Sequence, residues 1–195
     1  MSARRPTSWR RSSPTTSGRC RSTRRCSSSA KTRRIADDVQ IREAELADHG
    51  WVIERHAYLF EDEGGWGRPF IAMIARLVAD YLEDPDPELE AAWVAELRGQ
   101  RVGSVYCVRR SDEVAQLRLL FVDSAARGHR AGSKLVERCI EFARERGYRR
   151  MMLSTVSPLE SARRIYEAAG FRQTKEEPDP AFPEGTTAQE MWLEL

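Results

Sequence analysis

The sequence predicts an α/β domain in which helices cover both faces of a mixed central sheet. Short apolar runs typical of strands are interspersed with longer segments whose apolar residues recur at helical spacing. Their order is strand, two helices, three strands, helix, strand, helix and two strands. A doubly wound nucleotide-binding fold would alternate strand and helix throughout. The 195 residues are enough for one domain with its own core.

Residues 1–34 differ in composition from the rest of the chain. They contain eleven Arg and Lys and no Asp or Glu, and they lack an apolar periodicity that could offset the entropy of ordering. We expect a disordered Arg/Ser-rich tail ahead of a folded domain at 35–195. The tail lacks the apolar core of a secretory signal and superficially resembles an organelle transit peptide. We favour an inert extension.

The remaining residues hold 21 basic and 30 acidic side chains, a net of −9. A domain with this negative net charge is poorly suited to bind the phosphate backbone of a nucleic acid. Any nucleic-acid binding would therefore have to use the tail. No apolar run approaches the roughly 20 residues of a bilayer span. The cysteines and histidines show no zinc-binding spacing, so we expect no metal, free thiols and a cytoplasmic location.

The first half of the domain is expected to contain one strand and two helices. The alternation of VQIREA, residues 39–44, predicts a short half-buried strand. Asp48 is a predicted N-cap for a helix that ends at Gly64 and Gly65. A second helix is expected at about 69–82, since the DPDP sequence that follows cannot continue it.

Strands dominate the middle of the chain. Residues 91–97 and 101–110 read as a hairpin joined by Arg98, Gly99 and Gln100. The dense apolar run LRLLFV places a third strand, at about 114–123, in the centre of the sheet. The segments that follow are predicted as a helix at 131–147, a strand at 149–156, a helix at 159–170, and strands at 171–177 and 188–195.

The junction between the central strand and its following helix has the features of an anion site. Backbone amides in the first turn of a helix lack intrahelical acceptors and can bind a pyrophosphate. Gly128 and Gly132 would let the backbone approach such a ligand. Arg127, Arg130 and Lys134 could add charge-assisted contacts to its phosphates.

This junction resembles the acetyl-CoA loop of the GNAT acyltransferases, whose pattern is Gln or Arg, two residues, Gly, one residue, then Gly or Ala. Arg127 and Gly132 match its ends, and Arg130 replaces its central Gly. A second block, SARRIYEAAGF at 161–171, resembles the family's helix ending in Tyr-Glu-x-x-Gly-Phe. The hairpin before the central strand is also family-like. More narrowly, WVIERH, SDEVAQLRLLFV and RRIYEAAGF are similar to the acyltransferase half of proteins in which a MarR-type regulator is fused ahead of it.

The resemblance implies acetyl-CoA as co-substrate and Tyr166 as the general acid that protonates the departing thiolate. It also implies that the central strand splays, that its main chain pairs with the pantetheine arm, and that one N–H polarises the thioester carbonyl. The predicted cofactor-binding residues lie along this strand, turn and helix start: Leu120, Phe121, Val122, Arg127, Gly128, His129, Arg130, Ala131, Gly132, Ser133 and Lys134.

A base must also take the proton of the attacking amine. Glu113, near the start of the central strand, is the first candidate, and His56, Glu61 and Glu63 near the helical insert follow. Each of these carboxylates, considered alone, could equally be a solvated surface charge.

The sequence therefore predicts an acetyl-CoA-dependent N-acetyltransferase that acts directly on a primary amine, without a covalent enzyme intermediate. The acceptor, a small molecule or a peptide amine, is left open, as is a homodimer. One rival is an inactive acyl-CoA-binding regulatory module, which the substitution at Arg130 favours. The other is nucleic-acid binding through the basic tail.

Overall fold

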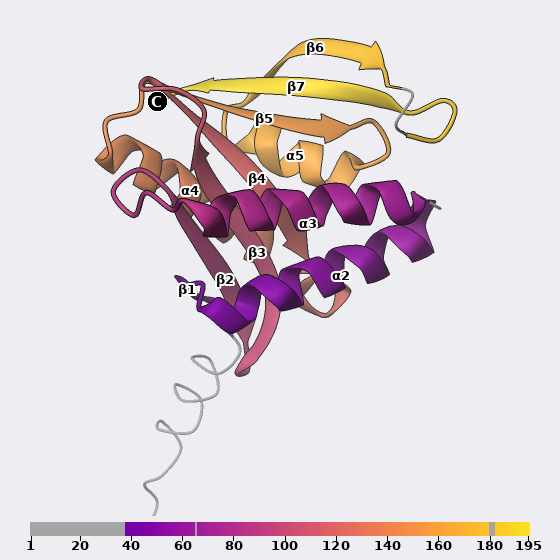
Figure 1. The fold of residues 1–195 in the computed structure, drawn as a ribbon, viewed down its shortest axis with the longest axis horizontal. Coiled ribbons are helices and arrows are strands. Elements are labelled where there is room, and N and C mark those ends of the chain that lie inside the picture. The colour runs from indigo at the N-terminus through magenta and orange to yellow at the C-terminus, as the bar shows by residue number, and fades with distance from the viewer. Residues whose placement is uncertain (1–37, 65, 180–181) are drawn as a thin grey trace, which may run out of the picture.

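The computed structural model describes residues 38–64, 66–179 and 182–195, with the side chains of 60–64 outside the description. Strands form the centre of the molecule (Figure 1): β1 Gln40–Glu43, β2 Ala91–Leu97, β3 Gln100–Arg109, β4 Val114–Val122, β5 Arg150–Val156, β6 Arg172–Pro178 and β7 Thr187–Glu194. Helices flank them: α2 Leu46–Gly64, α3 Gly67–Glu83, α4 Ala131–Glu145 and α5 Glu160–Ala168, with a 3₁₀ turn η1 at Ser124–Ala126. The predicted tail lies outside the described residues.

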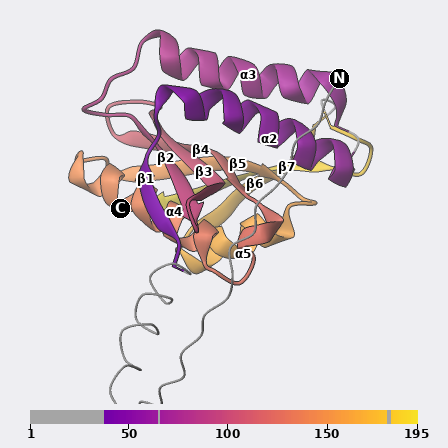
Figure 2. The same ribbon diagram turned by 90° about the horizontal axis from the view of Figure 1, so that it is seen from below.

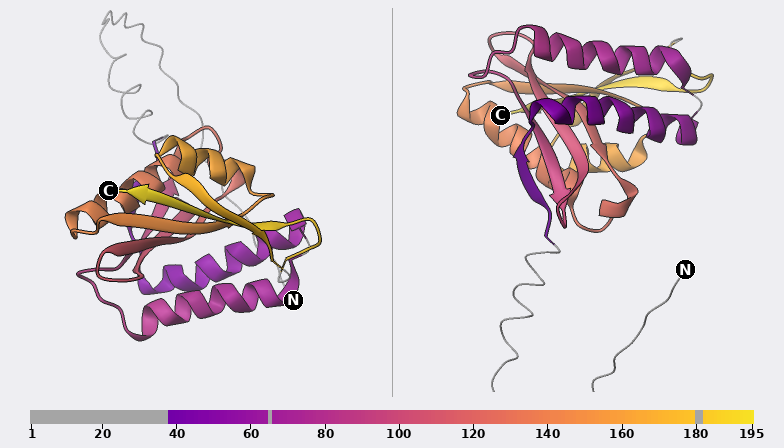
Figure 3. Two further views of the ribbon diagram at one scale, coloured as in Figure 1. Left: turned by 90° about the horizontal axis from the view of Figure 1, so that it is seen from above. Right: turned by 60° about the horizontal axis from the view of Figure 1, so that its bottom comes forward.

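The strands form one mixed sheet in the order β1-β2-β3-β4-β5-β7-β6. The first four pair antiparallel, β4 and β5 pair parallel, and β7 pairs antiparallel with both β5 and β6. The last strand of the chain is therefore inserted between its two predecessors (Figure 3). The predicted α/β class and element order are confirmed, whereas this insertion was not predicted.

Helices cover both faces of the sheet (Figure 2), and each face has its own apolar core. On one face, α4 and α5 bury residues such as Leu135 and Val136 against the strands. On the other, α2 and α3 bury Val52, Ile74 and Val78. The sheet is thus enclosed between two helical layers.

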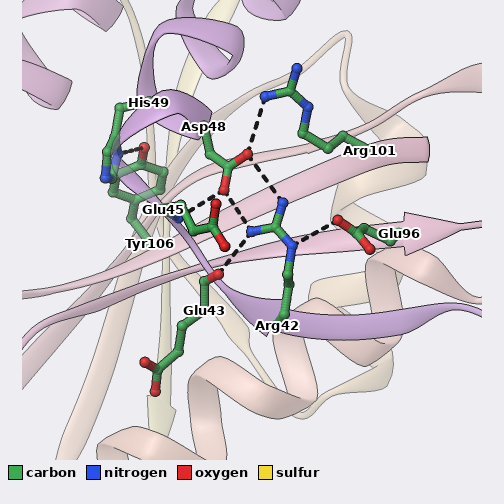
Figure 4. Close-up of polar contacts among 8 residues, drawn as sticks. All are labelled: Arg42, Glu43, Glu45, Asp48, His49, Glu96, Arg101 and Tyr106. Carbon is green, nitrogen blue, oxygen red and sulfur yellow. Dashed lines mark hydrogen bonds and ion pairs between the residues drawn. The ribbon is translucent and has the colours of Figure 1, made fainter. Parts of the chain in front are cut away.

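A network of ion pairs fixes the start of α2 against the sheet (Figure 4). The Asp48 carboxylate accepts hydrogen bonds from Arg42 of β1 (2.6 Å) and Arg101 of β3 (3.1 Å). It also accepts the Glu45 backbone N–H (2.8 Å). The helix begins at Leu46, three residues earlier than an N-cap at Asp48 predicts, so Asp48 caps the helix from inside its first turn.

Two further details differ from the sequence prediction. The β2–β3 loop contains only Arg98 and Gly99, since Gln100 already belongs to β3. Both loop residues have positive φ, 54° and 74°. This is the backbone of the two-residue turns whose twist matches that of a hairpin.

The outer strand β6 is exposed along its whole length and carries charged residues. Charges on an edge strand oppose pairing with another chain. Across the described helices, none is long and apolar enough to cross a bilayer. Nor do three potential metal-ligating side chains come together anywhere in the described ranges.

Candidate functional site

The sheet opens between β4 and β5. These parallel strands pair at only three positions, Val114 with Arg150, Ala115 with Met151 and Gln116 with Met152. Beyond Gln116 the two strands continue without pairing. The main-chain groups of residues 117–122 that face β5 therefore have no hydrogen bonds to a neighbouring strand. Such an edge can pair with an extended ligand.

A β-bulge lies at the point where the strands separate. Ser104 and Tyr106 of β3 pair with Phe121 and Arg118 of β4, so two β4 residues stand opposite one residue of β3. Leu119 has φ of 51°, a left-handed conformation that is rare for leucine. The buried Ser104 hydroxyl donates a hydrogen bond to the Leu119 carbonyl (3.0 Å), which holds the bulge in place.

The bulge reverses which side chains face which helical layer. Before it, Ala115 and Leu117 pack into the core under α4 and α5; after it, Leu120 and Val122 contact the same core. Residues 117 and 120 are three positions apart, whereas in a regular strand the side chains on one face are separated by an even number of positions. Phe121 consequently points toward α2, where its ring contacts Trp51.

A cavity of about 430 Å³ lies at this opening. Its lining includes Phe70, Ile74 and Leu77 of α3 from one helical layer and Tyr166 of α5 from the other. Residues of the unpaired parts of β4 and β5 line it between them. The cavity therefore passes through the sheet, and a molecule bound on one face can meet a molecule bound on the other.

Tyr166 lines this cavity and is 5% exposed. Burial raises the pKa of its phenol well above the ordinary value, and the neighbouring Cys139 adds to the effect. Tyr166 is therefore protonated at neutral pH and able to donate a hydrogen bond. Nearby, the buried Thr155 hydroxyl has no hydrogen-bond partner among the described residues, although it lines the same cavity. An orphaned hydroxyl in the wall of the cavity that Tyr166 lines fits a ligand that carries polar groups.

His56 of α2 also lines the cavity. Its Nδ1 lies 2.8 Å from the Val52 carbonyl, which can only accept, so Nδ1 carries the proton of the neutral ring. Burial lowers the pKa of His56 to about 4, although the bond to Val52 opposes this. At neutral pH the ring is therefore uncharged, and its Nε2 has a lone pair.

The N-terminus of α4 follows the bulged strand through η1 and a short loop. The first bond of the helix runs from the Lys134 N–H to the Arg130 carbonyl (3.0 Å), so the amides of 131–133 have no intrahelical acceptor. Gly128 has φ of 80°, and a Cβ there would meet nothing within 4 Å. This geometry fits the predicted pyrophosphate site.

Arg130 occupies the N-cap of α4 with φ of 58°. A left-handed backbone explains why glycine suits this position in the acetyl-CoA loop pattern. The Arg130 side chain is 73% exposed and lies 3.5 Å from Glu137, along the helix. Arg127 is also exposed, whereas His129 is partly buried.

Two predicted cofactor ligands have other structural roles. A Cβ on Gly132 would approach the Ile165 Cδ1 to 2.6 Å, so this glycine allows α4 and α5 to pack closely. Lys134 donates to the Asp38 carboxylate (2.5 Å) and to the Val39 carbonyl (3.0 Å). Its ammonium therefore binds the chain leading into β1, and its contact with a phosphate stays a prediction.

Glu113 is not brought to the cavity. It precedes β4 at the end where that strand pairs with β5, about 20 Å of strand away from the bulge. Its side chain is 54% exposed and pairs with Arg149 (3.2 Å). We therefore withdraw Glu113 as the base and retain His56; the side chains of Glu61 and Glu63 lie outside the described residues.

Several site residues were missed from the sequence: Ser104, Gln116, Arg118 and Leu119. No sequence signal marks the bulge, because Leu119 has no preference for a positive φ. Arg118 could have been noticed, since it interrupts the densest apolar run of the chain.

Comparisons with known proteins agree with this geometry. The family model described as Acetyltransferase (GNAT) family matches residues 45–171. An N-acetylaspartate synthetase of Danio rerio is 39% identical over 111 residues, which cover 56% of this chain and 38% of that protein. N-acetyltransferase 8 of Homo sapiens is 36% identical over 87 residues, 42% of this chain and 38% of that one. The chain thus matches about two fifths of the length of these relatives.

Among solved structures, yncA of Salmonella typhimurium, determined with its cofactor acetyl-CoA, superposes with a TM-score of 0.64. The two are 25% identical, and the match covers 80% of this chain and 94% of that one.

Proposed function

Because the chain belongs to the acetyltransferase (GNAT) family, we propose that it is an N-acetyltransferase that moves an acetyl group from acetyl-CoA directly to a primary amine. The observation that carries the proposal is the cavity that crosses the sheet where β4 and β5 separate. A direct transfer needs two substrates to meet from opposite sides, and this opening joins the two faces. The names of the curated relatives, which include N-acetyltransferase 8, support transfer to nitrogen.

The α4 side of the sheet suits the cofactor. The free amides at the start of α4 would bind the pyrophosphate, with Arg127 adjacent to them. The unpaired edge of β4 would bind the pantetheine arm, and an N–H near the bulge would polarise the carbonyl. Bound acetyl-CoA supplies an acyl group activated as a thioester.

Two side chains in the cavity can handle protons. Tyr166 would donate a hydrogen bond to the departing sulfur, and the His56 Nε2 would accept the proton of the amine. The described cysteines, Cys107 and Cys139, are buried, and burial raises the pKa of Cys139. Neither is suited to form an acyl-enzyme, which favours direct attack by the amine.

The test is acetyl transfer by the full chain, followed as release of free thiol and as acetylated amine by mass spectrometry. Thiol release that requires an added amine is the expected result. His56→Asn should lower kcat more than it changes KM, and an unchanged kcat would assign the proton to water. Coenzyme A binding without transfer to any amine would refute the proposed activity.

That last outcome would favour a second function, an acyl-CoA-binding regulatory module. It is motivated by Arg130, which holds a strained backbone where the family's loop pattern has glycine. The resemblance to the acyltransferase half of MarR fusions would then give it a regulatory context.

A further inference from the structure

Two polar side chains on β4 line the cavity without partners. The side chains of Arg118 and Gln116 make no hydrogen bond or ion pair with any described residue, yet both residues line the cavity, and Gln116 is 7% exposed. A cation that is partly removed from water without a carboxylate in direct contact is unfavourable, and an anionic ligand would offset this cost. Burial lowers the pKa of Arg118, and the charge of Arg110 adds to this, while Asp80 and Glu90 oppose it.

Both side chains face α3. Ala115 and Leu117 point into the core under α4 and α5, so the alternate residues Gln116 and Arg118 point the other way. The pairing of Arg118 with Tyr106, whose ring lies in the core under α2 and α3, places it on the same face. The phosphate-binding start of α4 is on the opposite face, so Arg118 is positioned for the acceptor and not for the cofactor.

The rest of the wall on this face is mostly apolar. Phe70, Ile74 and Leu77 of α3 surround the two polar groups. Among the described lining residues Asp179 carries the one carboxylate. In such surroundings a guanidinium and an amide N–H₂ that project from alternate residues of one strand can bind the two oxygens of a carboxylate.

We propose that the acceptor amine carries a carboxylate, which Arg118 binds with Gln116 beside it on the α3 side of the cavity. The acceptor class is therefore an amino acid or a similar amino-carboxylate. This inference rests on the proposed transfer reaction for its catalytic consequence but not for the binding site itself.

The test compares α-, β- and γ-amino acids, each with its own carboxamide, as acceptors for the full chain. Amidation lowers the pKa of the amine and so increases its neutral, reactive fraction. A preference for the free acid therefore cannot come from amine reactivity. We expect kcat/KM to favour the acid of the best-fitting pair by about 10- to 100-fold, mainly through KM.

Variants of Arg118 test whether this residue causes the preference for the acid. Arg118→Gln should reduce it to about one and leave the Kd for coenzyme A unchanged, and Arg118→Lys should retain part of it. Arg110→Gln is the matched control, because it removes the same charge from a neighbouring position outside the cavity wall. A preference that survives Arg118→Gln, or that disappears equally in Arg110→Gln, overturns the inference, as does an Arg118→Gln effect confined to coenzyme A.

Binding separates this inference from the proposed reaction. Calorimetric titration of the same acids and carboxamides into the protein with coenzyme A needs no turnover. Acids that bind no more tightly than their amides refute the carboxylate site. Acid-selective binding that depends on Arg118, with no acetyl transfer to any amine, supports the site and refutes the transferase.

Discussion

At the scale of single residues, the cavity sets the protonation state of the groups that line it. Burial raises the pKa of Tyr166 and lowers that of His56 to about 4, because in each case it disfavours the charged form. Both side chains are therefore neutral at pH 7, one as a hydrogen-bond donor and the other as an acceptor. Direct acyl transfer to an amine needs this pair of roles.

Tyr166→Phe should leave the affinity for acetyl-CoA nearly intact and lower kcat by roughly 10- to 10⁴-fold, the lower end applying if water replaces the phenol. The phenyl ring preserves packing, including the contact with Phe171 at 6.0 Å between ring centroids. Steady-state kinetics with a binding titration measures the split. An unchanged kcat, with chemistry shown to limit turnover, would assign Tyr166 to packing alone.

Replacing Arg130 measures the backbone strain at the predicted cofactor loop. Its left-handed φ of 58° costs an arginine or an alanine about 1 kcal/mol but costs glycine little. Arg130→Gly should therefore be more stable than Arg130→Ala by about 1 kcal/mol, as measured by denaturant unfolding. Equal stabilities would mean that the loop relaxes out of this conformation.

The same pair of variants tests our sequence-based prediction that Arg130 binds a phosphate. Loss of that contact should weaken coenzyme A binding by about 1 to 3 kcal/mol in both variants, and more so at low salt. Tighter binding by Arg130→Gly alone would instead mark the arginine as an obstruction.

At the scale of secondary-structure elements, two local devices position the site. The bulge in β4, held by the Ser104 hydroxyl, turns one strand into a wall with different side chains on its two faces. The buried carboxylate of Asp48 fixes α2, and with it His56, against β1 and β3. Both devices depend on partners distant in the sequence.

Asp48 should make stability depend on pH. Burial alone would raise the pKa of its carboxyl, but hydrogen bonds from Arg42, Glu45 and Arg101 outweigh it and lower the pKa from 3.8 to about 2. The unfolded chain therefore binds more protons in this range. The contribution, about 2 kcal/mol, is present above about pH 4 and is lost as the pH falls through about 2.

Asp48→Asn should accordingly lower the free energy of unfolding by about 2 kcal/mol at pH 7, with the deficit shrinking below pH 4. Glu113→Gln is the matched control, because its exposed ion pair with Arg149 should contribute less than about 1 kcal/mol. Denaturant titrations across pH measure both, and a deficit that does not change with pH would contradict the ion-pair explanation.

At the scale of the whole molecule, the described domain encloses the sheet between two helical layers and opens it at one place. The predicted tail, residues 1–34, carries no periodic apolar face that could add to this core. Deleting it should change the melting temperature by less than about 2 °C and leave the Kd for coenzyme A unchanged. A fall of more than about 5 °C would show that the tail contributes to the fold.

The sequence by itself determined the elements and their order and predicted the location of the cofactor loop, because these depend on local patterns. Apolar periodicity marked β4 and α4, glycines marked helix ends, and the block around Tyr166 was found from its own residues.

Only the tertiary structure decided which of these residues meet. The strand pairing placed Glu113 away from the cavity, an ion pair with Asp38 occupied Lys134, and packing against Ile165 explained Gly132. The bulge at Leu119 and the exposure of Arg118 to the cavity depend on register and on where β4 and β5 part. Register is set by contacts between residues far apart in the chain, which no local pattern encodes.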